Sequence, residues 1–354
     1  SYSYPERGDL VARLKILLAT YVRAGGLRPI LLMHDGKHGD SMISTMARQG
    51  RGLPANVLPM SLHSVMSLGH EVLSAGLAAG AERVVVLAPP DKAHEMPPLE
   101  AEVQLANTFA SALGHGGPRV VVNAERDPEA VEAALHGLPA LAAAPAGAIV
   151  VEGTKRDLAR TALAHLRETG AARPERVPLP AGAPYGRIIV DVGGCTLCLS
   201  CAGACPTGAI SDNPDRPQIA FNESACVQCG ICVATCPEKV IRLEPRYDFT
   251  PAALSPVVVK GEEPFHCVEC GKAFGTKATI DKVVARLKGH AMFADEARLR
   301  VIQMCDTCRV VAVANAADDP MRLGDRPRIR TTEDYVAAAA EAKRTGRKPE
   351  DFLD

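Results

Sequence analysis

Aromatic side chains and long apolar runs are scarce in this sequence of 354 residues, which has no tryptophan, six tyrosines and seven phenylalanines. Most of its apolar residues are alanine, valine and leucine, which suit helices layered on a sheet better than an aromatic ligand cage. The longest apolar run, LPALAAAPAGAIVV from Leu138, is interrupted by prolines and a glycine. A membrane-spanning helix needs ~20 apolar residues, so we expect no transmembrane segment.

An excess of charge is also missing, because 40 basic side chains nearly balance 41 acidic ones. This balance gives no long-range attraction to nucleic acid, and we expect no nucleic-acid partner. The chain begins at Ser1 without the residue order of a signal peptide, and we expect its true N-terminus to lie further upstream.

Cysteine is absent from the first 194 residues, and all 12 cysteines follow in phrases built on Cys-x-x-Cys. This clustered spacing is typical of metal ligands and differs from the scattered cysteines of a disulfide framework. The pattern therefore favours a reducing, cytoplasmic compartment.

Motifs of self-sufficient catalysis are missing as well. The sequence has neither the G-x-G-x-x-G fingerprint of dinucleotide binding nor a Walker loop, and it has no recognisable nucleophile elbow or acid–base carboxylate pair. We therefore predict no catalytic residue in this chain.

Residues 1–172 alternate short β-branched runs with helical patterns, which predicts an α/β Rossmann-like domain on a parallel sheet. The expected strands begin at Pro29, Asn56, Arg83, Arg119 and Ala148. The expected helices span 7–24, 38–50, 64–79, 97–113, 128–137 and 155–169.

Polar residues follow the first three of these strands, at the sheet edge where α/β proteins bind ligands. They are His34, Asp35, Lys37, His38, Ser61, His63, Asp91, Lys92 and His94. The stretch HDGKHGD from His34 could cradle a phosphate, but glycine-containing turns of this kind are common. We favour the interpretation that these residues are ordinary polar loop residues and form a docking surface.

A proline-rich stretch at 173–186 predicts an extended linker after the first domain. Cysteine-containing domains follow at 187–248 and 249–318. In the remaining tail, 319–354, we expect one alanine-rich helix that begins at Thr331 with Asp334 in its first turn.

Two matching phrases, CTLCLSCAGACP from Cys195 and CVQCGICVATCP from Cys226, form an internal repeat with a shift of 31 residues. Each has the spacing C-x2-C-x2-C-x3-C-P, in which the first three cysteines bind one [4Fe-4S] cluster and the fourth binds the other. The rule predicts one cluster on Cys195, Cys198, Cys201 and Cys236, and a second on Cys226, Cys229, Cys232 and Cys205. Zinc or buried thiols are the alternatives, although zinc sites generally use two separated pairs.

Two more Cys-x-x-Cys pairs, Cys267 with Cys270 and Cys305 with Cys308, predict a zinc-ribbon-like module with one structural Zn²⁺. The 34 residues between the pairs exceed the usual spacing, and a helix within TIDKVVARLKGH could fill the gap. A rubredoxin-like iron, a third cluster or thiols without metal remain open alternatives. His266 adjoins a ligand but is not needed by a complete four-sulfur shell.

Residues 187–248 closely resemble bacterial two-[4Fe-4S] ferredoxins, which implies their compact pseudo-twofold fold and one-electron transfer. With LLMHDGKHGD, GRGLPANVLP and FHCVECGKAFGTKATI, most of the chain resembles the C-terminal half of the multi-cluster ferredoxins associated with proteobacterial molybdenum or tungsten formate dehydrogenases. The resemblance implies that further ferredoxin motifs precede Ser1. It also implies redox enzyme subunits, including a formate dehydrogenase, as partners.

The function predicted first is an electron-transfer subunit that relays single electrons through two clusters inside a redox complex. A flavin- or nucleotide-binding oxidoreductase that uses the first domain is one alternative, although the missing dinucleotide fingerprint opposes it. An iron-sulfur regulatory or assembly protein is another.

Overall fold

The structure is a computed structural model that describes residues 7–147, 153–214, 216–293, 295–315 and 329–353. The chain divides into two compact units, Ser1–Gly261 and Glu262–Asp354. The first unit holds the parallel sheet and the paired cysteine phrases, and the second holds the remaining four cysteines.

A parallel sheet forms the core of the N-terminal part, as the sequence predicted. Its strands have the order β2-β1-β3-β4, and β1 lies between β2 and β3. They are β1 (Ile30–Asp35), β2 (Val57–Leu62), β3 (Arg83–Leu87) and β4 (Val120–Asn123). The strand predicted from Ala148 falls at 148–152, outside the described residues.

Helices follow the strands at nearly the predicted positions. They are α1 (Arg7–Arg23), α2 (His38–Gln49), α3 (His70–Ala78), α4 (Met96–Ala112), α5 (Pro128–His136) and α6 (Lys155–Thr169), with short 3-10 turns η1 (Val65–Ser67) and η2 (Pro90–Glu95). Local capping explains two of the helix starts. Asp127 accepts the backbone N–H of Glu129 before α5, and Thr154 forms a capping box with Asp157 before α6.

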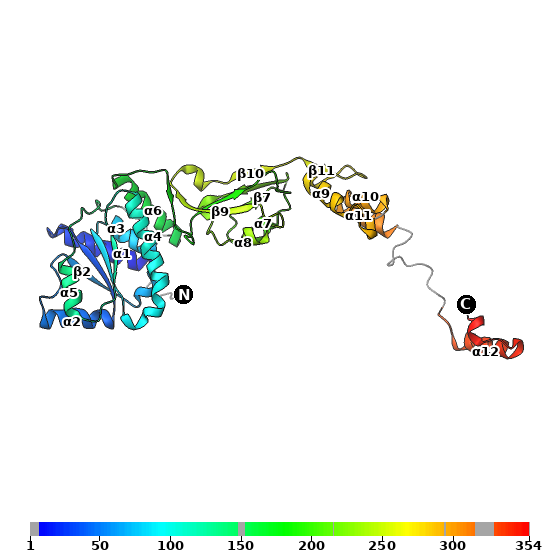
Figure 1. Ribbon diagram of the computed structural model, residues 1–354, viewed down its shortest axis with the longest axis horizontal. Coiled ribbons are helices and arrows are strands. Elements are labelled where there is room, and N and C mark those ends of the chain that lie inside the picture. The colour runs from blue at the N-terminus through cyan, green and yellow to red at the C-terminus, as the bar shows by residue number, and fades with distance from the viewer. Residues whose placement is uncertain (1–6, 148–152, 215, 294, 316–328, 354) are drawn as a thin grey trace. The chain divides into compact units, whose positions relative to one another are not determined.

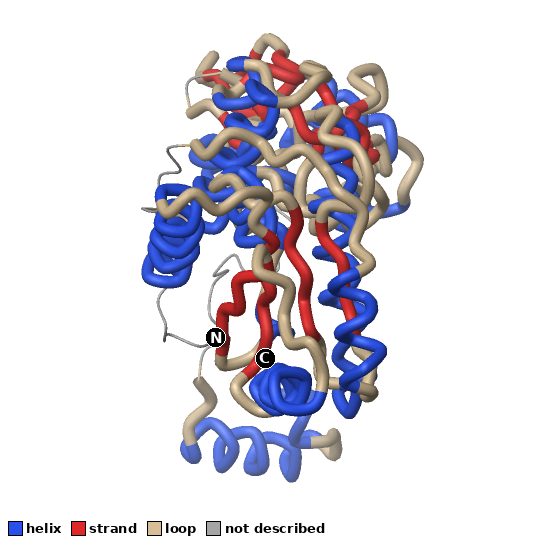
Figure 2. Tube along the Cα trace, turned by 90° about the vertical axis from the view of Figure 1, so that its left-hand side faces the viewer, coloured by secondary structure: helices blue, strands red, loops and turns tan. Residues whose placement is uncertain are grey.

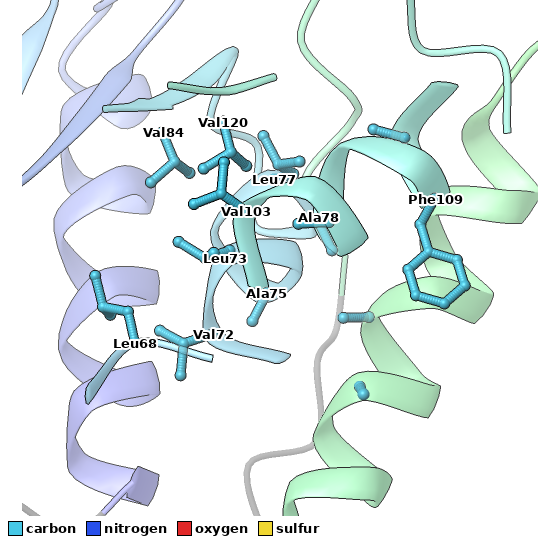
Figure 3. Packing of buried hydrophobic residues seen from close by; sticks show 14 of the residues in the cluster. Leu68, Val72, Leu73, Ala75, Leu77, Ala78, Val84, Val103, Phe109 and Val120 are labelled. Atoms are coloured by element: carbon cyan, nitrogen blue, oxygen red, sulfur yellow. The ribbon is translucent and has the colours of Figure 1, made fainter. Parts of the chain in front are cut away.

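Both faces of the sheet are covered by helices (Figures 1 and 2). Alternate residues of a strand point to opposite faces, so Leu31 of β1 packs in the cluster shared with α1, α3, α4 and α6, whereas Leu32 packs against α2 and α5. Figure 3 shows part of the larger cluster, where Leu77 of α3 and Val103 of α4 lie near Val84. Burial on both faces explains the continuous apolar strands.

A buried carboxylate fastens the start of β3. Glu82 is fully buried and accepts hydrogen bonds from Arg28 Nε at 2.8 Å and from the backbone N–H of Leu141 at 2.7 Å. Burial alone would raise the pKa of this carboxyl, but these hydrogen bonds and the charge of Arg28 outweigh it and lower the pKa below its usual 4.5. Glu82 therefore stabilises the fold as an anion.

Replacing Glu82 by glutamine is expected to destabilise the protein by about 1.5–3 kcal/mol at neutral pH, because charge-assisted hydrogen bonds are lost. A lowered carboxyl pKa stabilises the fold fully above pH 4.5, and this stabilisation is lost as the pH falls through the lowered value. The difference in the free energy of unfolding between wild type and Glu82→Gln should therefore become smaller at acidic pH. Urea unfolding followed by helical circular dichroism between pH 7 and about pH 3.5 checks this; a constant difference would contradict it.

The cysteine phrases lie in a small α+β arrangement with two antiparallel sheets, β5-β9-β6 and β10-β8-β7. The strands are β5 (Arg176–Pro178), β6 (Gly186–Val190), β7 (Ile210–Asp212), β8 (Gln218–Phe221), β9 (Ile241–Asp248) and β10 (Val257–Gly261). Between them lie α7 (Ser200–Ala204), η3 (Glu223–Ala225), α8 (Ile231–Thr235) and η4 (Pro251–Leu254). The stretch predicted as a linker thus supplies β5, which pairs with β9; the predicted domain boundaries stay a prediction.

The second unit begins with a hairpin of β11 (Pro264–His266) and β12 (Ala273–Thr276). Four helices and two 3-10 turns follow among its described residues: α9 (Lys277–Leu287), η5 (Ala291–Phe293), α10 (Glu296–Ile302), α11 (Asp306–Ala314), α12 (Thr332–Thr345) and η6 (Pro349–Phe352). The predicted tail helix is confirmed as α12, with the expected capping box of Thr331 and Asp334. A helix with the length and apolarity to cross a membrane does not occur in the described parts of the chain.

Candidate iron-sulfur site

The eight cysteines of the two phrases gather around two separate cavities. Ile188, Phe221 and Leu243 contribute apolar walls to one cavity, and Val190, Ile219 and Val240 to the other. One cavity is lined by Cys195, Cys198, Cys201 and Cys236. The other is lined by Cys205, Cys226, Cys229 and Cys232. Each cavity thus brings together three cysteines of one phrase and the fourth of the other, which are the two predicted ligand sets.

The repeat is preserved in the backbone. Leu197 and Gln228, which correspond after the 31-residue shift, both have left-handed φ angles, 54° and 55°. Their backbone N–H groups donate to the sulfur of the first cysteine of their phrase, Cys195 or Cys226, at 3.5 Å each. Donors aimed at sulfur suit a thiolate ligand and help to set the potential of a bound cluster.

One further residue with a left-handed φ angle follows each phrase. Gly208 has φ +65° and Lys239, its counterpart in the repeat, has φ +54°. The backbone N–H of each donates to the carbonyl of the fourth cysteine of its phrase, Cys205 at 3.3 Å or Cys236 at 3.2 Å. The same tight turn is therefore made by Gly208 without strain and by Lys239 with the steric strain that a Cβ atom causes in the left-handed conformation.

Replacing Lys239 by glycine is expected to stabilise the folded protein by about 1 kcal/mol, because glycine adopts the left-handed conformation without strain. The reverse change, Gly208→Ala, should destabilise by a similar amount; its Cβ would meet nothing within 4 Å, so strain alone acts. Thermal unfolding midpoints of both variants check this pair, and equal signs would contradict it.

Burial and hydrogen bonding shift the pKa values of the Cys232 and Cys205 thiols in opposite directions. Burial and the neighbouring sulfur of Cys226 raise the pKa of the Cys232 thiol to about 11. Burial acts in the same direction on Cys205, but hydrogen bonds from Ile210, Thr207 and Ala209 outweigh it and lower the pKa of that thiol. The site is therefore a set of partly buried sulfurs with backbone donors, a donor set that fits iron-sulfur clusters.

The N-terminal α/β part contacts the second phrase through Arg156 of α6. Its guanidinium donates to the carbonyls of Pro184 at 2.7 Å, Ser224 at 3.0 Å and Cys226 at 3.0 Å. It also lies over the ring of Tyr185, with its central carbon 4.6 Å from the ring centroid. A residue 70 positions away in the sequence thus fixes the backbone of a predicted ligand.

Aromatic residues, although few in the sequence, collect at the same junction. Tyr185 meets Phe109 and Tyr247 edge to face, with centroids 6.2 and 5.1 Å apart. The Tyr185 hydroxyl lies 2.6 Å from Nε2 of His70, and His70 Nδ1 lies 2.5 Å from a carboxylate oxygen of Glu102. These contacts join α3 and α4 to the strand that leads into the first cysteine phrase.

A larger cavity borders this junction and is lined by Arg156, Arg160, Tyr247 and Arg246 among others. Its arginines already have partners in the protein. Arg246 contacts Glu223 Oε2 at 2.7 Å, and Arg160 contacts Asp157 Oδ1 at 3.2 Å. The cavity therefore offers apolar walls rather than a set of uncommitted charges.

The remaining cysteines form a compact group in the second unit. The sulfurs of Cys267, Cys270, Cys305 and Cys308 lie within 4.8 Å of one another, and Cys270 and Cys305 are 3.7 Å apart. A tetrahedral shell with Zn–S bonds of ~2.3 Å has edges of about 3.8 Å, so the spacing fits one metal ion. Cys267 and Cys270 lie in the turn between β11 and β12, and Cys305 and Cys308 lie at the start of α11.

Within this group the pKa values of the Cys267 and Cys308 thiols are shifted in opposite directions. Burial opposes ionisation of Cys267, but backbone N–H groups of Cys270 and Cys305 donate to its sulfur and lower its pKa to about 6. Hydrogen bonds with the other thiols, Cys270 first, raise the pKa of Cys308. Metal binding to such a group displaces protons and is therefore favoured as the pH rises.

Two of the polar residues predicted at the sheet edge, His34 and Asp35, make local contacts. Asp35 accepts the backbone N–H groups of Lys37 and Gly39, at 3.1 and 2.9 Å, and so holds the turn into α2. His34 is buried, with Nδ1 3.0 Å from the carbonyl of Asp35 and 3.3 Å from Asp40. These contacts agree with the favoured interpretation of ordinary loop polarity.

A family model described as a 4Fe-4S dicluster domain matches residues 194–241. This chain carries a 4Fe-4S ferredoxin-type domain. The match covers both cysteine phrases, whereas the wall residues Ile188, Val190 and Leu243 of the two cavities lie just outside it. The N-terminal sheet and the second unit lie outside it.

Curated relatives match short segments of the chain. The chain is 44% identical over 43 residues to the polyferredoxin-like subunit of an aliphatic sulfonate oxidoreductase from Pyrococcus furiosus, covering 12% of this chain and 25% of that protein. It is 29% identical over 83 residues to the ferredoxin-type protein NapH of Haemophilus influenzae, covering 20% and 29%. A subunit of an ion-translocating oxidoreductase complex from Methanosarcina acetivorans is 42% identical over 50 residues, covering 14% and 18%. The chain thus spans less than a third of each of these relatives.

Sequence reasoning found the cysteines of this ferredoxin-type domain but missed the residues that contact them. Arg156 and Lys260 donate to the carbonyls of Cys226 and Cys195, and the Gln228 side chain donates to the Cys226 sulfur. Superposing the two phrases could have singled out Gln228, because its counterpart is the apolar Leu197. Sequence alone gives no comparable signal for Arg156.

Proposed function

We propose that this protein is an electron-transfer subunit of a redox complex, with [4Fe-4S] clusters on the two predicted ligand sets. The observation that carries the proposal is the sorting of the eight cysteines into two cavities, each with three ligands of one phrase and one of the other. Each bound cluster would supply a one-electron couple. The chain's own residues hold it, exclude water and donate hydrogen bonds to its sulfurs.

The partners we propose are subunits of an oxidoreductase in a reducing, cytoplasmic compartment. Support comes from the relatives, which are named as subunits of a sulfonate oxidoreductase and of an ion-translocating oxidoreductase complex. The sequence resemblance adds a molybdenum or tungsten formate dehydrogenase as the first partner to test. For the group of Cys267, Cys270, Cys305 and Cys308 we propose one structural Zn²⁺, supported by its sulfur spacing.

Anaerobic purification of the protein from its native host, with metals, sulfide and flavin quantified on the co-purifying complex, tests the proposal. We expect about eight iron, eight sulfide and one zinc per chain, together with a molybdenum- or tungsten-containing enzyme. Another redox enzyme in its place would keep the electron-transfer function and replace the partner. Flavin bound to this chain without any redox partner would instead favour the oxidoreductase alternative.

A further inference from the structure

The two cysteine phrases differ at a position beside the first ligand of each, held by Gln228 in the second phrase and by Leu197 in the first. Besides its backbone N–H, Gln228 directs its side-chain Nε2 at the sulfur of Cys226, at 3.4 Å. Its counterpart Leu197 offers only the backbone N–H to Cys195. The second phrase therefore has one more N–H group on its first ligand than the first phrase.

The orientation of the Gln228 amide follows from its surroundings. Nε2 lies 3.2 Å from the carbonyl oxygen of Arg187 as well as near the Cys226 sulfur. Both neighbours are acceptors, so only the NH₂ end of the amide can face them. The other end, Oε1, is buried without a hydrogen-bond partner among the described residues. The amide is thus held with its donors toward the ligand.

Cations also contact equivalent carbonyls in the two phrases, but in different settings. Arg156 donates to the carbonyl of Cys226, and Lys260 of β10 donates to that of Cys195. Both contacts are partly buried, but the guanidinium is also fixed by two further carbonyls and by the ring of Tyr185, whereas Lys260 has a flexible stem and a second, exposed contact with the carbonyl of Val192. A positive charge that is held in place beside a ligand stabilises negative charge added there.

We propose that Gln228 and Arg156 raise the reduction potential of the cluster held by Cys205, Cys226, Cys229 and Cys232 above that of the other cluster. Reduction adds one negative charge to a cluster, and hydrogen bonds to sulfur and nearby positive charge both stabilise that state. The inference rests on the proposed function, because it assumes that both clusters are present. The difference makes the first electron added to the protein reside at the second phrase, beside the α/β part.

A reductive titration of the full-length protein, followed by electron paramagnetic resonance, tests this. We expect two one-electron steps in the wild type. Gln228→Leu installs the residue of the first phrase. This variant and Arg156→Gln should each lower the reduction potential of the step at higher potential by about 59 mV, which is a tenfold change in its equilibrium constant. The potential of the other step should not change. Arg156→Lys should retain part of the effect.

Two control variants separate these effects from general disturbance. Lys260→Met should lower only the other step, whereas Arg160→Gln, on the same helix as Arg156 but paired with Asp157, should move neither. If Arg156→Gln fails to retain its cluster, Gln228→Leu and Arg156→Lys decide. An unchanged higher step in variants that keep both clusters would overturn the inference. A wild type without cluster signals would overturn the proposed function instead.

Discussion

Replacing Cys205 by alanine is expected to remove the cluster beside the second phrase, not the one beside the phrase to which Cys205 belongs. Cys205 lines the cavity of Cys226, Cys229 and Cys232, across the repeat from its own neighbours. Iron and sulfide should each fall from about eight to about four per chain, because a cluster needs its fourth thiolate. Metal and sulfide analysis of anaerobically prepared protein measures the loss.

Double variants make the crossed arrangement decisive. Adding Cys229→Ala to Cys205→Ala removes two ligands of the same cluster, so about four iron should remain. Adding Cys198→Ala instead removes one ligand from each cluster, so almost no iron should remain. Uncrossed ligand sets would give the opposite result for the two double variants. Cys236→Ala serves as the mirror control, since it should remove the other cluster.

Removing the Zn²⁺ that we propose for the second unit is expected to unfold the region around its four cysteines. The hydrophobic core of this region is small, with Cys267, Met304 and Cys305 at its centre. A structural Zn²⁺, in contrast, contributes about 10–16 kcal/mol of apparent binding free energy. Cys305→Ala should therefore abolish zinc binding and expose residues 262–314 to limited proteolysis. Zinc analysis and mapping of the cleavage sites check both effects.

His266 provides the matched control for this experiment. It adjoins Cys267, but its Nδ1 lies 3.0 Å from the carbonyl of Gly271, within the turn of the first pair. His266→Ala should therefore leave one zinc per chain bound, because four sulfurs complete a tetrahedral shell. Loss of zinc from this variant, or iron in place of zinc in the wild type, would contradict the proposed site.

Local sequence signals predicted the helices and the four described strands of the N-terminal parallel sheet, whereas the antiparallel strands β5 to β10 were not predicted individually. The capping residues Asp127 and Thr154 mark helix starts, and the continuous valines of β3 mark a strand buried on both faces. The fixed spacing of the cysteines predicted which of them would meet, since that rule contains its own long-range information.

Features that depend on distant parts of the chain were beyond the sequence. The prolines at 173–186 indicated an extended segment, but its pairing with β9 as β5 depends on a partner about 70 residues away. The contact of Arg156 with Cys226 likewise joins two parts whose patterns are independent. The left-handed Lys239 was hidden because its side chain gives no sign of the backbone conformation that the repeat imposes.

The position of β9 has a consequence for how the protein is made. This strand is the centre of the β5-β9-β6 sheet, yet it is the last of the three to leave the ribosome. Both cysteine phrases are therefore synthesised before the sheet beside them can close. The eight cysteines are thus already present in the nascent chain while the sheet still lacks its central strand, which ends at Asp248.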